Sequence, residues 1–132
     1  MAYDHGLDPC PFCAIERHRF LIETGHAIAL LDAFPVTEGH TLVVPRHHVA
    51  SIYELPGDEQ SAIWALVAEV RVKLFAEYRP DGFNIGLNDG VAAGQTVMHA
   101  HIHVIPRRKG DVPDPRGGVR WIMANRAKYW KD

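Results

Sequence analysis

The stretch QTVMHAHIHVIP, residues 95–106, sets a histidine at every second position of an otherwise apolar run: His99, His101 and His103. Alternation with a period of two is typical of a β-strand, in which successive side chains point to opposite faces of the sheet. We therefore predict a strand over residues 97–105. The three histidines should share one face of it, and the apolar residues between them should face the core.

The segments on either side of this run predict three more strands and one helix. Residues 27–31, 41–45 and 83–87 are short runs of apolar residues bounded by turn residues, as strands are. Apolar residues recur every three or four positions from Asp58, a candidate N-cap, to Tyr78, which indicates an amphipathic helix. The helix should end at Arg79-Pro80-Asp81-Gly82. The expected fold class is α+β with an antiparallel sheet, and the Pro- and Gly-rich residues 110–120 should wrap the surface.

Length and composition limit the possible functions. With 132 residues, 47% hydrophobic, 23% charged and a net charge of −2, the chain should form one domain spanning residues 1–132, with no general affinity for nucleic acid. No signal peptide is recognisable after Met1 and no apolar run approaches the roughly 20 residues that cross a bilayer. We therefore expect a cytoplasmic protein without a membrane partner, whose two cysteines stay reduced.

Three interpretations of the histidine face compete. The imidazoles could be polar residues on the solvent side of a sheet. They could bind a catalytic metal that keeps one position open for water. In the third interpretation one imidazole is a nucleophile, and its neighbours orient it, pass a proton or bind anionic oxygen.

The pair Cys10 and Cys13 has the two-residue spacing that lets both thiolates reach one zinc ion. With His48 and His99 the pair could complete a tetrahedral Cys₂His₂ site, which would leave two histidines for chemistry. Two unrelated buried thiols are the alternative. A thiol redox motif is disfavoured because no βαβ pattern surrounds the cysteines.

Several motifs together resemble the histidine triad (HIT) family. They are His99-Ala100-His101-Ile102-His103-Val104-Ile105, the preceding Gly94-Gln95-Thr96-Val97, Asn88-Asp89-Gly90, and residues 39–48, GHTLVVPRHH. The likeness covers about residues 9–108 and leaves a C-terminal tail, residues 109–132. The resemblance implies a five-stranded antiparallel sheet with one long helix and a short N-terminal helix. It also implies a homodimer, and hydrolysis or transfer at the α-phosphate of nucleotide conjugates.

The resemblance also implies residue roles. His101 would be the nucleophile that attacks the α-phosphorus, His103 would bind a phosphate oxygen or the leaving group, and His40 would align the triad. The nucleotide-binding positions of the family correspond to Asp32, Asn88, Gly94, Gln95, Thr96 and His103. Its zinc ligands correspond to Cys10, Cys13, His48 and His99, with His47 as a neighbouring alternative to His48. Four protein ligands would make the Zn²⁺ structural, with no open position for substrate.

The expected substrates are dinucleoside polyphosphates, cleaved by water or by phosphate, and nucleoside phosphoramidates or aminoacyl adenylates. A nucleotide-binding signalling module with little turnover is the alternative of another class. The basic cluster Arg107-Arg108-Lys109 could meet phosphate or be a solvated loop. In the tail, Arg116, Arg120 and Trp121 could close over a second nucleotide or only pack the tail.

Overall fold

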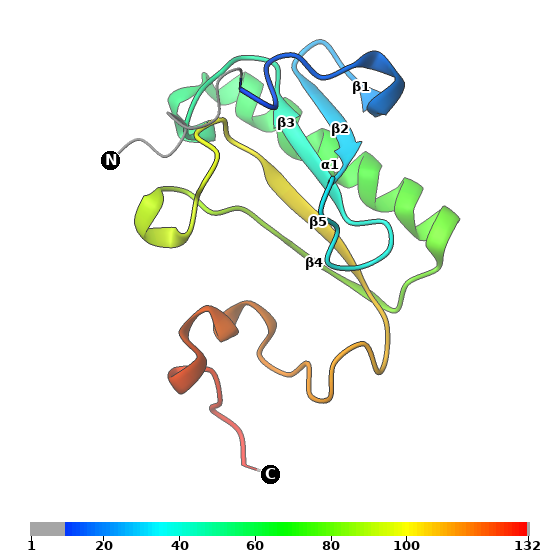
Figure 1. The fold of residues 1–132 in the computed structure, drawn as a ribbon, viewed down its shortest axis with the longest axis vertical. Coiled ribbons are helices and arrows are strands. Elements are labelled where there is room, and N and C mark those ends of the chain that lie inside the picture. The colour runs from blue at the N-terminus through cyan, green and yellow to red at the C-terminus, as the bar shows by residue number, and fades with distance from the viewer. Residues whose placement is uncertain (1–9, 132) are drawn as a thin grey trace.

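The computed structural model describes residues 10–131, so the predicted absence of a signal peptide after Met1 falls outside the described residues. Figure 1 shows an antiparallel sheet of five strands with one long helix across it, which confirms the α+β prediction. The strand order is β1-β2-β3-β5-β4. The elements are β1 (Phe20–Glu23), β2 (Ala27–Leu31), β3 (Thr41–Pro45), α1 (Gly57–Tyr78), β4 (Gly82–Gly86) and β5 (Ile102–Arg107). Within residues 10–131, no helix is both long and apolar enough to cross a membrane.

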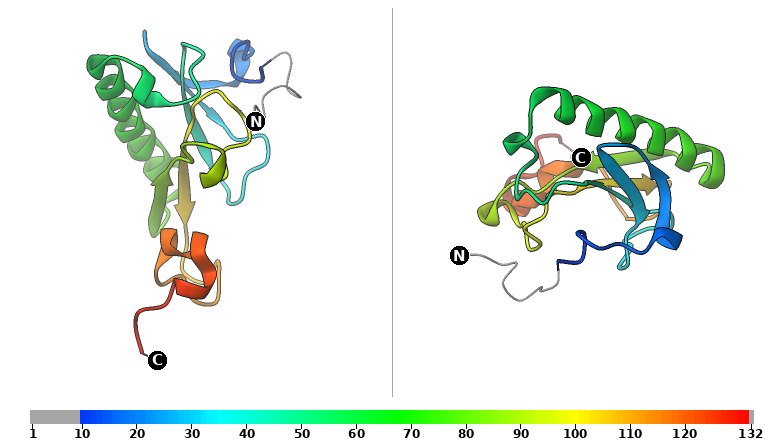
Figure 2. Two further views of the ribbon diagram at one scale, coloured as in Figure 1. Left: turned by 90° about the vertical axis from the view of Figure 1, so that its left-hand side faces the viewer. Right: turned by 90° about the horizontal axis from the view of Figure 1, so that it is seen from above.

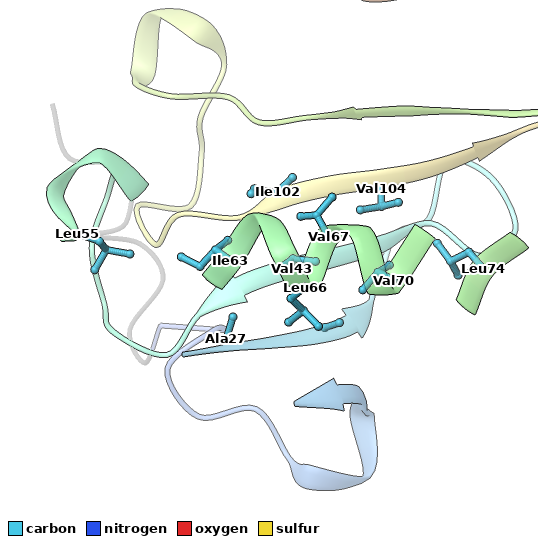
Figure 3. Close-up of a cluster of buried hydrophobic side chains, with 11 residues drawn as sticks. Ala27, Val43, Leu55, Ile63, Leu66, Val67, Val70, Leu74, Ile102 and Val104 are labelled. Carbon is cyan, nitrogen blue, oxygen red and sulfur yellow. The ribbon is translucent and has the colours of Figure 1, made fainter. Parts of the chain in front are cut away.

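One face of the sheet is covered by α1, as the left view of Figure 2 shows. The helix turns Ile63, Leu66, Val67, Val70 and Leu74 toward the strands, which is the predicted spacing of three or four residues. They pack on buried side chains of β2, β3 and β5 (Figure 3). Burying each large aliphatic side chain stabilises the fold by about 1.5–3 kcal/mol, so this layer fixes where β5 runs.

The opposite face of the sheet carries candidate site residues predicted from the sequence. On β2 and β3 this face is apolar and is covered by residues of the N-terminal segment, Phe12, Ile15 and Phe20. His103 of β5 pairs with Leu42 of β3 and therefore lies on this face rather than under the helix. Along β5 the residues alternate between buried and half-buried from Ile102 to Arg107, as the sequence predicts for a strand with one face in the core.

The predicted start of the histidine strand is wrong. We expected residues 97–105, but β5 begins at Ile102, and His99 lies in a bend before it. The backbone N–H of Ala100 bonds the carbonyl of Val49 at 2.7 Å, in the loop that follows β3, instead of a ladder partner. Because β3 ends at Pro45, whose nitrogen has no hydrogen to donate, the ladder cannot continue alongside residues 97–101. The three histidines therefore do not share one strand face.

Other element boundaries shift by a residue. The helix begins at Gly57, so Asp58 lies in the first turn and is not the N-cap. It ends as predicted, with Arg79 in the left-handed region (φ 49°) before Pro80. The strand predicted at residues 83–87 is β4, Gly82–Gly86. The edge strand β1 was not located from the sequence. From residue 10 onward, the part of the N-terminal region that the structure describes has a 3₁₀ turn at Arg17–Arg19 where the resemblance implies a short helix.

The C-terminal tail is more ordered than the sequence indicates. Instead of wrapping the sheet, it extends beyond one end of it (Figures 1 and 2). Its residues Gly118–Arg126 form two 3₁₀ segments that meet at a kink at Met123 (φ −120°, ψ 77°). The tail is joined to the sheet near Arg107, whose guanidinium binds Asp111 at 2.7 Å and the side-chain oxygen of Asn84 on β4 at 2.7 Å.

Candidate functional site

A pocket of about 540 Å³ lies on the sheet face opposite α1, where β5 begins. His101 and His103 line it from one side, and Asp32 and His40 from the loop between β2 and β3. Asn88, Gly94 and Thr96 line it from the loop between β4 and β5. Residues that are distant in sequence therefore meet here, and most of the predicted nucleotide-binding positions face one cavity.

His99 and His101 are oriented by backbone carbonyls. The Nε2 of buried His99 lies 2.8 Å from the carbonyl oxygen of Pro45, and the Nδ1 of His101 lies 2.9 Å from the carbonyl oxygen of His99. A carbonyl can only accept, so each of these ring nitrogens carries the hydrogen. In the neutral rings the other nitrogens, Nδ1 of His99 and Nε2 of His101, keep their lone pairs. His101 thus has the tautomer that a nucleophile attacking through Nε2 needs.

His103 has the opposite tautomer, set by His40. The backbone N–H of Val36 donates to Nδ1 of His40 at 3.1 Å, which leaves the His40 hydrogen on Nε2. That nitrogen lies 2.9 Å from Nδ1 of His103 and 3.4 Å from a carboxylate oxygen of Asp32. His103 therefore accepts at Nδ1 and carries its own hydrogen on Nε2. In this pocket His101 thus offers a lone pair at Nε2, and the neighbouring His103 offers a hydrogen-bond donor at its own Nε2.

Burial favours the neutral form of His40, His99 and His103. It lowers the pKa of His103 to about 4, with smaller contributions from His101 and His40. Burial also lowers the pKa of His40, partly opposed by Asp32, and the pKa of His99, partly opposed by its bond to Pro45. Neutral rings are what both a nucleophile and a hydrogen-bonding network require at physiological pH.

The predicted metal ligands Cys10, Cys13, His48 and His99 form a cluster in which one donor atom of each lies within 4.8 Å of all the others. The Nδ1 of His99 lies 3.5 Å and 3.6 Å from the two sulfurs and 3.2 Å from Nδ1 of His48. A tetrahedral zinc ion with ordinary bond lengths would separate N and S ligands by about 3.6 Å and two nitrogens by about 3.4 Å. The donor set and its spacing therefore fit a metal ion. His47 does not join the cluster, since its ring pairs with Glu59 at 3.2 Å.

Gln95 differs from the other predicted nucleotide-binding residues because it does not line the pocket. Its side chain is buried, accepts from the N–H of Gly90 at 2.8 Å and donates to the carbonyls of Ala50 and Val97 at 2.8 Å and 3.0 Å. These bonds hold the loop that carries Asn88, Gly94 and Thr96. In the structure Gln95 positions the loop.

Sequence reasoning missed several residues of the pocket, among them Phe12, Arg19 and Phe34. Phe12 packs against both His99 and His101, with ring centroids 5.8 Å and 5.1 Å apart. Arg19 is the one Lys or Arg among the described residues that line the pocket. Phe34, 87% exposed, stands at its rim. Phe12 lies between Cys10 and Cys13 in the sequence, and a metal site shared by these cysteines and His99 would bring it close to the histidines. No sequence pattern marks Arg19 or Phe34.

The basic cluster Arg107-Arg108-Lys109, which begins at the last residue of β5, does not line this pocket. Arg107 is engaged with Asp111 and Asn84, and Arg108 lies 3.8 Å from Glu38. The tail residues are also engaged within the tail. Arg116 pairs with Asp114 at 3.0 Å, Arg120 donates to the carbonyl of Ala127 at 2.8 Å, and the indole of Trp121 donates to the carbonyl of Arg116 at 2.7 Å. These contacts favour the interpretation that the three residues pack the tail.

Comparisons with known proteins agree with this geometry. Residues 16–110 match the family model described as HIT domain. The adenylylsulfatase HINT3 of Arabidopsis thaliana is 34% identical over 77% of this chain, which spans about half, 54%, of that relative. A hypothetical histidine triad nucleotide-binding protein of Sulfolobus tokodaii superposes with a TM-score of 0.72 and 35% identity, over 80% of this chain and 73% of the other.

A second solved structure bears on the cysteine and histidine cluster. A zinc-bound histidine triad family protein of Mycobacterium smegmatis superposes with a TM-score of 0.65 and 35% identity, over 80% of this chain and 81% of the other. The region that matches the family model, residues 16–110, spans the sheet, the helix and the histidine run and contains every lining residue of the pocket except Pro11 and Phe12. The family model, the relative and the two structures agree, and the chain belongs to the HIT domain family.

Proposed function

We propose that the protein cleaves nucleotide conjugates at the α-phosphate through a nucleotidyl group held covalently on His101. The observation that carries this proposal is the bond from Nδ1–H of His101 to the carbonyl of His99, which leaves the Nε2 lone pair for attack. The family supports a nucleotide ligand, and a relative named adenylylsulfatase supports an adenylyl conjugate as one substrate.

The pocket offers partners for each part of a nucleotide. The Asp32 carboxylate, 16% exposed at the side chain, can accept from ribose hydroxyls, and Asn88 stands on the other side of the cavity. Phe12 and Phe34 provide apolar surface for the base. The hydroxyl of Thr96, the Nε2–H of His103 and the guanidinium of Arg19 can donate to phosphate oxygens.

The reaction proceeds in two steps. The Nε2 lone pair of His101 forms a bond to the α-phosphorus, and the bond to the leaving atom breaks with its electron pair moving to that atom, which is then protonated by water. Water next attacks the same phosphorus and releases a proton, which neutralises the hydroxide left when the leaving atom was protonated. The P–N bond breaks with its electron pair returning to Nε2 of His101, and the nucleoside monophosphate leaves. Because His103 is neutral, it stabilises the anionic oxygens as a hydrogen-bond donor and stays protonated at Nε2 throughout. If phosphate replaces water, the product is a nucleoside diphosphate.

We also propose that the cluster of Cys10, Cys13, His48 and His99 holds a structural Zn²⁺. The zinc-bound relative and the ligand spacing support this assignment. Zinc supplies binding free energy that becomes folding free energy when its four ligands come from the protein. His99 ties the cluster to the pocket, because its carbonyl is the acceptor that orients His101.

Replacement of His101 by Asn should remove the nucleophile without removing the pocket. We expect turnover of an adenylyl conjugate to fall by at least about 10³-fold, with AMP affinity within about threefold of wild type. His103→Asn should lose less activity, because it removes a hydrogen-bond donor and not the reacting atom. Steady-state kinetics and calorimetry with AMP measure both effects.

The covalent intermediate provides the control for that result. Rapid acid-free quenching of the wild-type reaction should trap an acid-labile nucleotidyl group that mass spectrometry maps to His101 and that is absent in His101→Asn. Substantial residual turnover in His101→Asn, or an adduct on another residue, would place the nucleophile elsewhere.

The low pKa of His103 should appear as a pH-dependent stability. Its folded value is about 4 against 6.5 for an exposed ring, so between these values the unfolded chain binds more protons. The neutral, buried His103 ring therefore makes its full contribution to the free energy of unfolding above pH 6.5. This contribution is lost as the pH falls to 4, and the loss is at most about 3 kcal/mol. Urea unfolding of wild type and His103→Gln from pH 7.5 to 4 should show the wild-type advantage shrinking. A constant difference across that range contradicts the shift.

Substitution of two neighbouring histidines, His48 and His47, tests the zinc assignment. Purified protein should contain about one zinc per chain, and His48→Gln should lower the zinc content and the melting temperature, by roughly 10 °C for a loss of about 3 kcal/mol. His47→Gln is the matched control and should keep both, since its ring lies outside the cluster. Full zinc occupancy in His48→Gln, measured by elemental analysis, would show that the ligand set is wrong.

A further inference from the structure

The loop between β2 and β3, residues 32–40, lies beside the end of β5 (Figure 1, loop in cyan and strand in gold). The ladder between β3 and β5 ends at the pair Thr41 and Val104, and β5 extends three residues further. A loop side chain bonds to this extension, since the hydroxyl of Thr37 donates to the carbonyl of Pro106 at 2.8 Å. This bond fixes the middle of the loop to β5.

The backbone around Thr37 holds His40 at two points. The carbonyl of Thr37 accepts from the backbone N–H of His40 at 3.2 Å. The N–H of the preceding residue, Val36, donates to Nδ1 of the His40 ring at 3.1 Å. The residue pair that the Thr37 hydroxyl anchors therefore contacts both the backbone and the ring of His40.

The bond from Val36 decides which ring nitrogens carry hydrogen. The contact of 2.9 Å between Nε2 of His40 and Nδ1 of His103 allows donation in either direction. While Val36 donates to Nδ1 of His40, the hydrogen of His40 lies on Nε2, and His103 must accept. Asp32 favours the same arrangement, but its carboxylate lies 3.4 Å from Nε2 of His40, at the long limit of a hydrogen bond.

Without the bond from Val36 the two rings can exchange their roles. His40 can then carry its hydrogen on Nδ1 and accept at Nε2 from Nδ1 of His103. His103 would in that case have a lone pair on Nε2, in place of the hydrogen that we assign to the phosphate oxygens. The position of one backbone N–H thus controls whether His103 is a donor to the substrate.

The C-terminal end of the loop is held by other contacts. Gly39, at φ +89°, packs so closely on Tyr78 of α1 that an added Cβ would lie 2.9 Å from its ring. This contact keeps the backbone beside His40 in place without help from Thr37. Loss of the Thr37 hydroxyl should therefore release Val36 and leave the rest of the loop folded.

We propose that Thr37 is a positioning residue that sets the tautomer of His103 from outside the pocket. It acts through Val36 and the ring of His40, and it is not among the described residues that line the pocket of the histidines. The effect on catalysis rests on the proposed function, whereas the effect on the ring hydrogens does not depend on it.

The test compares Thr37→Val, which removes the hydroxyl and nearly keeps the shape of the side chain, with Thr37→Ser, which keeps a hydroxyl. Long-range ¹H–¹⁵N correlation spectra at pH 7.5 report the hydrogen of each ring. In Thr37→Val we expect the hydrogens of His40 and His103 to move from Nε2 toward Nδ1. Thr37→Ser should retain the wild-type pattern, because its hydroxyl can still reach Pro106.

Thr24→Val is the matched control for a loss of stability. The Thr24 hydroxyl also holds a turn, since it accepts from the N–H groups of His26 and Ala27 at 3.2 Å and 3.1 Å, but this turn joins β1 and β2. Thr24→Val should lower the melting temperature by a few degrees and leave the hydrogens of both rings on Nε2.

Turnover of an adenylyl conjugate measures the catalytic consequence. Thr37→Val should lower kcat by at least about tenfold, because a donor to the reacting phosphate is lost, and should change KM by less than about threefold. Thr37→Ser should restore kcat to within about threefold of the wild type.

The outcomes separate this inference from the proposed function. If the ring hydrogens stay on Nε2 of both histidines in Thr37→Val, or move equally in Thr24→Val, the inference is overturned. If the wild type forms the adduct on His101 and kcat of Thr37→Val is unchanged despite shifted hydrogens, the inference also falls, since Thr37 then positions nothing that the reaction uses. The proposed function fails on a different readout, an absent adduct on His101, which leaves the shift of the ring hydrogens intact.

Discussion

The hydrogen bond from the buried His99 to the carbonyl of Pro45, 2.8 Å long, is the interaction on which the site depends. This bond requires the hydrogen of the neutral His99 ring to be on Nε2. The lone pair on Nδ1 of His99 therefore faces the two cysteines and His48. The backbone carbonyl of the same residue accepts from Nδ1–H of His101, so His99 contacts both the Cys/His cluster and the proposed nucleophile. Pro45 can serve as this acceptor because it ends β3 beside the bend that carries His99.

The three histidines of the run differ in their hydrogen bonding because their partners differ. His99 and His101 both donate to carbonyls, but through different ring nitrogens, whereas His103 accepts from His40. Burial keeps His103 and His40 neutral, so the pocket offers one lone pair and one hydrogen-bond donor without a fixed positive charge from either of these rings. A second cavity, of about 630 Å³, lies beyond His103 along the same face of β5 and shares Val36 with this pocket.

The sequence predicts those parts of the structure in which local pattern and burial agree. The strands β2 and β3, the helix α1 and its stop at Arg79 have clear periods and stop signals. The start of β5 does not follow from alternation, because the bond of Ala100 to Val49 is a tertiary contact. Other features depend on loops that meet only in the folded chain. They are the inward-facing amide of Gln95, the position of Arg19 beside the pocket and the second cavity next to the C-terminal tail.

The tautomers of the histidine rings test the account most directly, because both the proposed metal cluster and the proposed nucleophile depend on them. Long-range ¹H–¹⁵N correlation spectra of ¹⁵N-histidine-labelled protein at pH 7.5 distinguish a protonated from an unprotonated ring nitrogen at each site. We expect the hydrogen on Nδ1 of His101 and on Nε2 of both His99 and His103, as their partners require. A hydrogen on Nε2 of His101 would contradict the account, since the atom proposed to attack phosphorus would then have no lone pair.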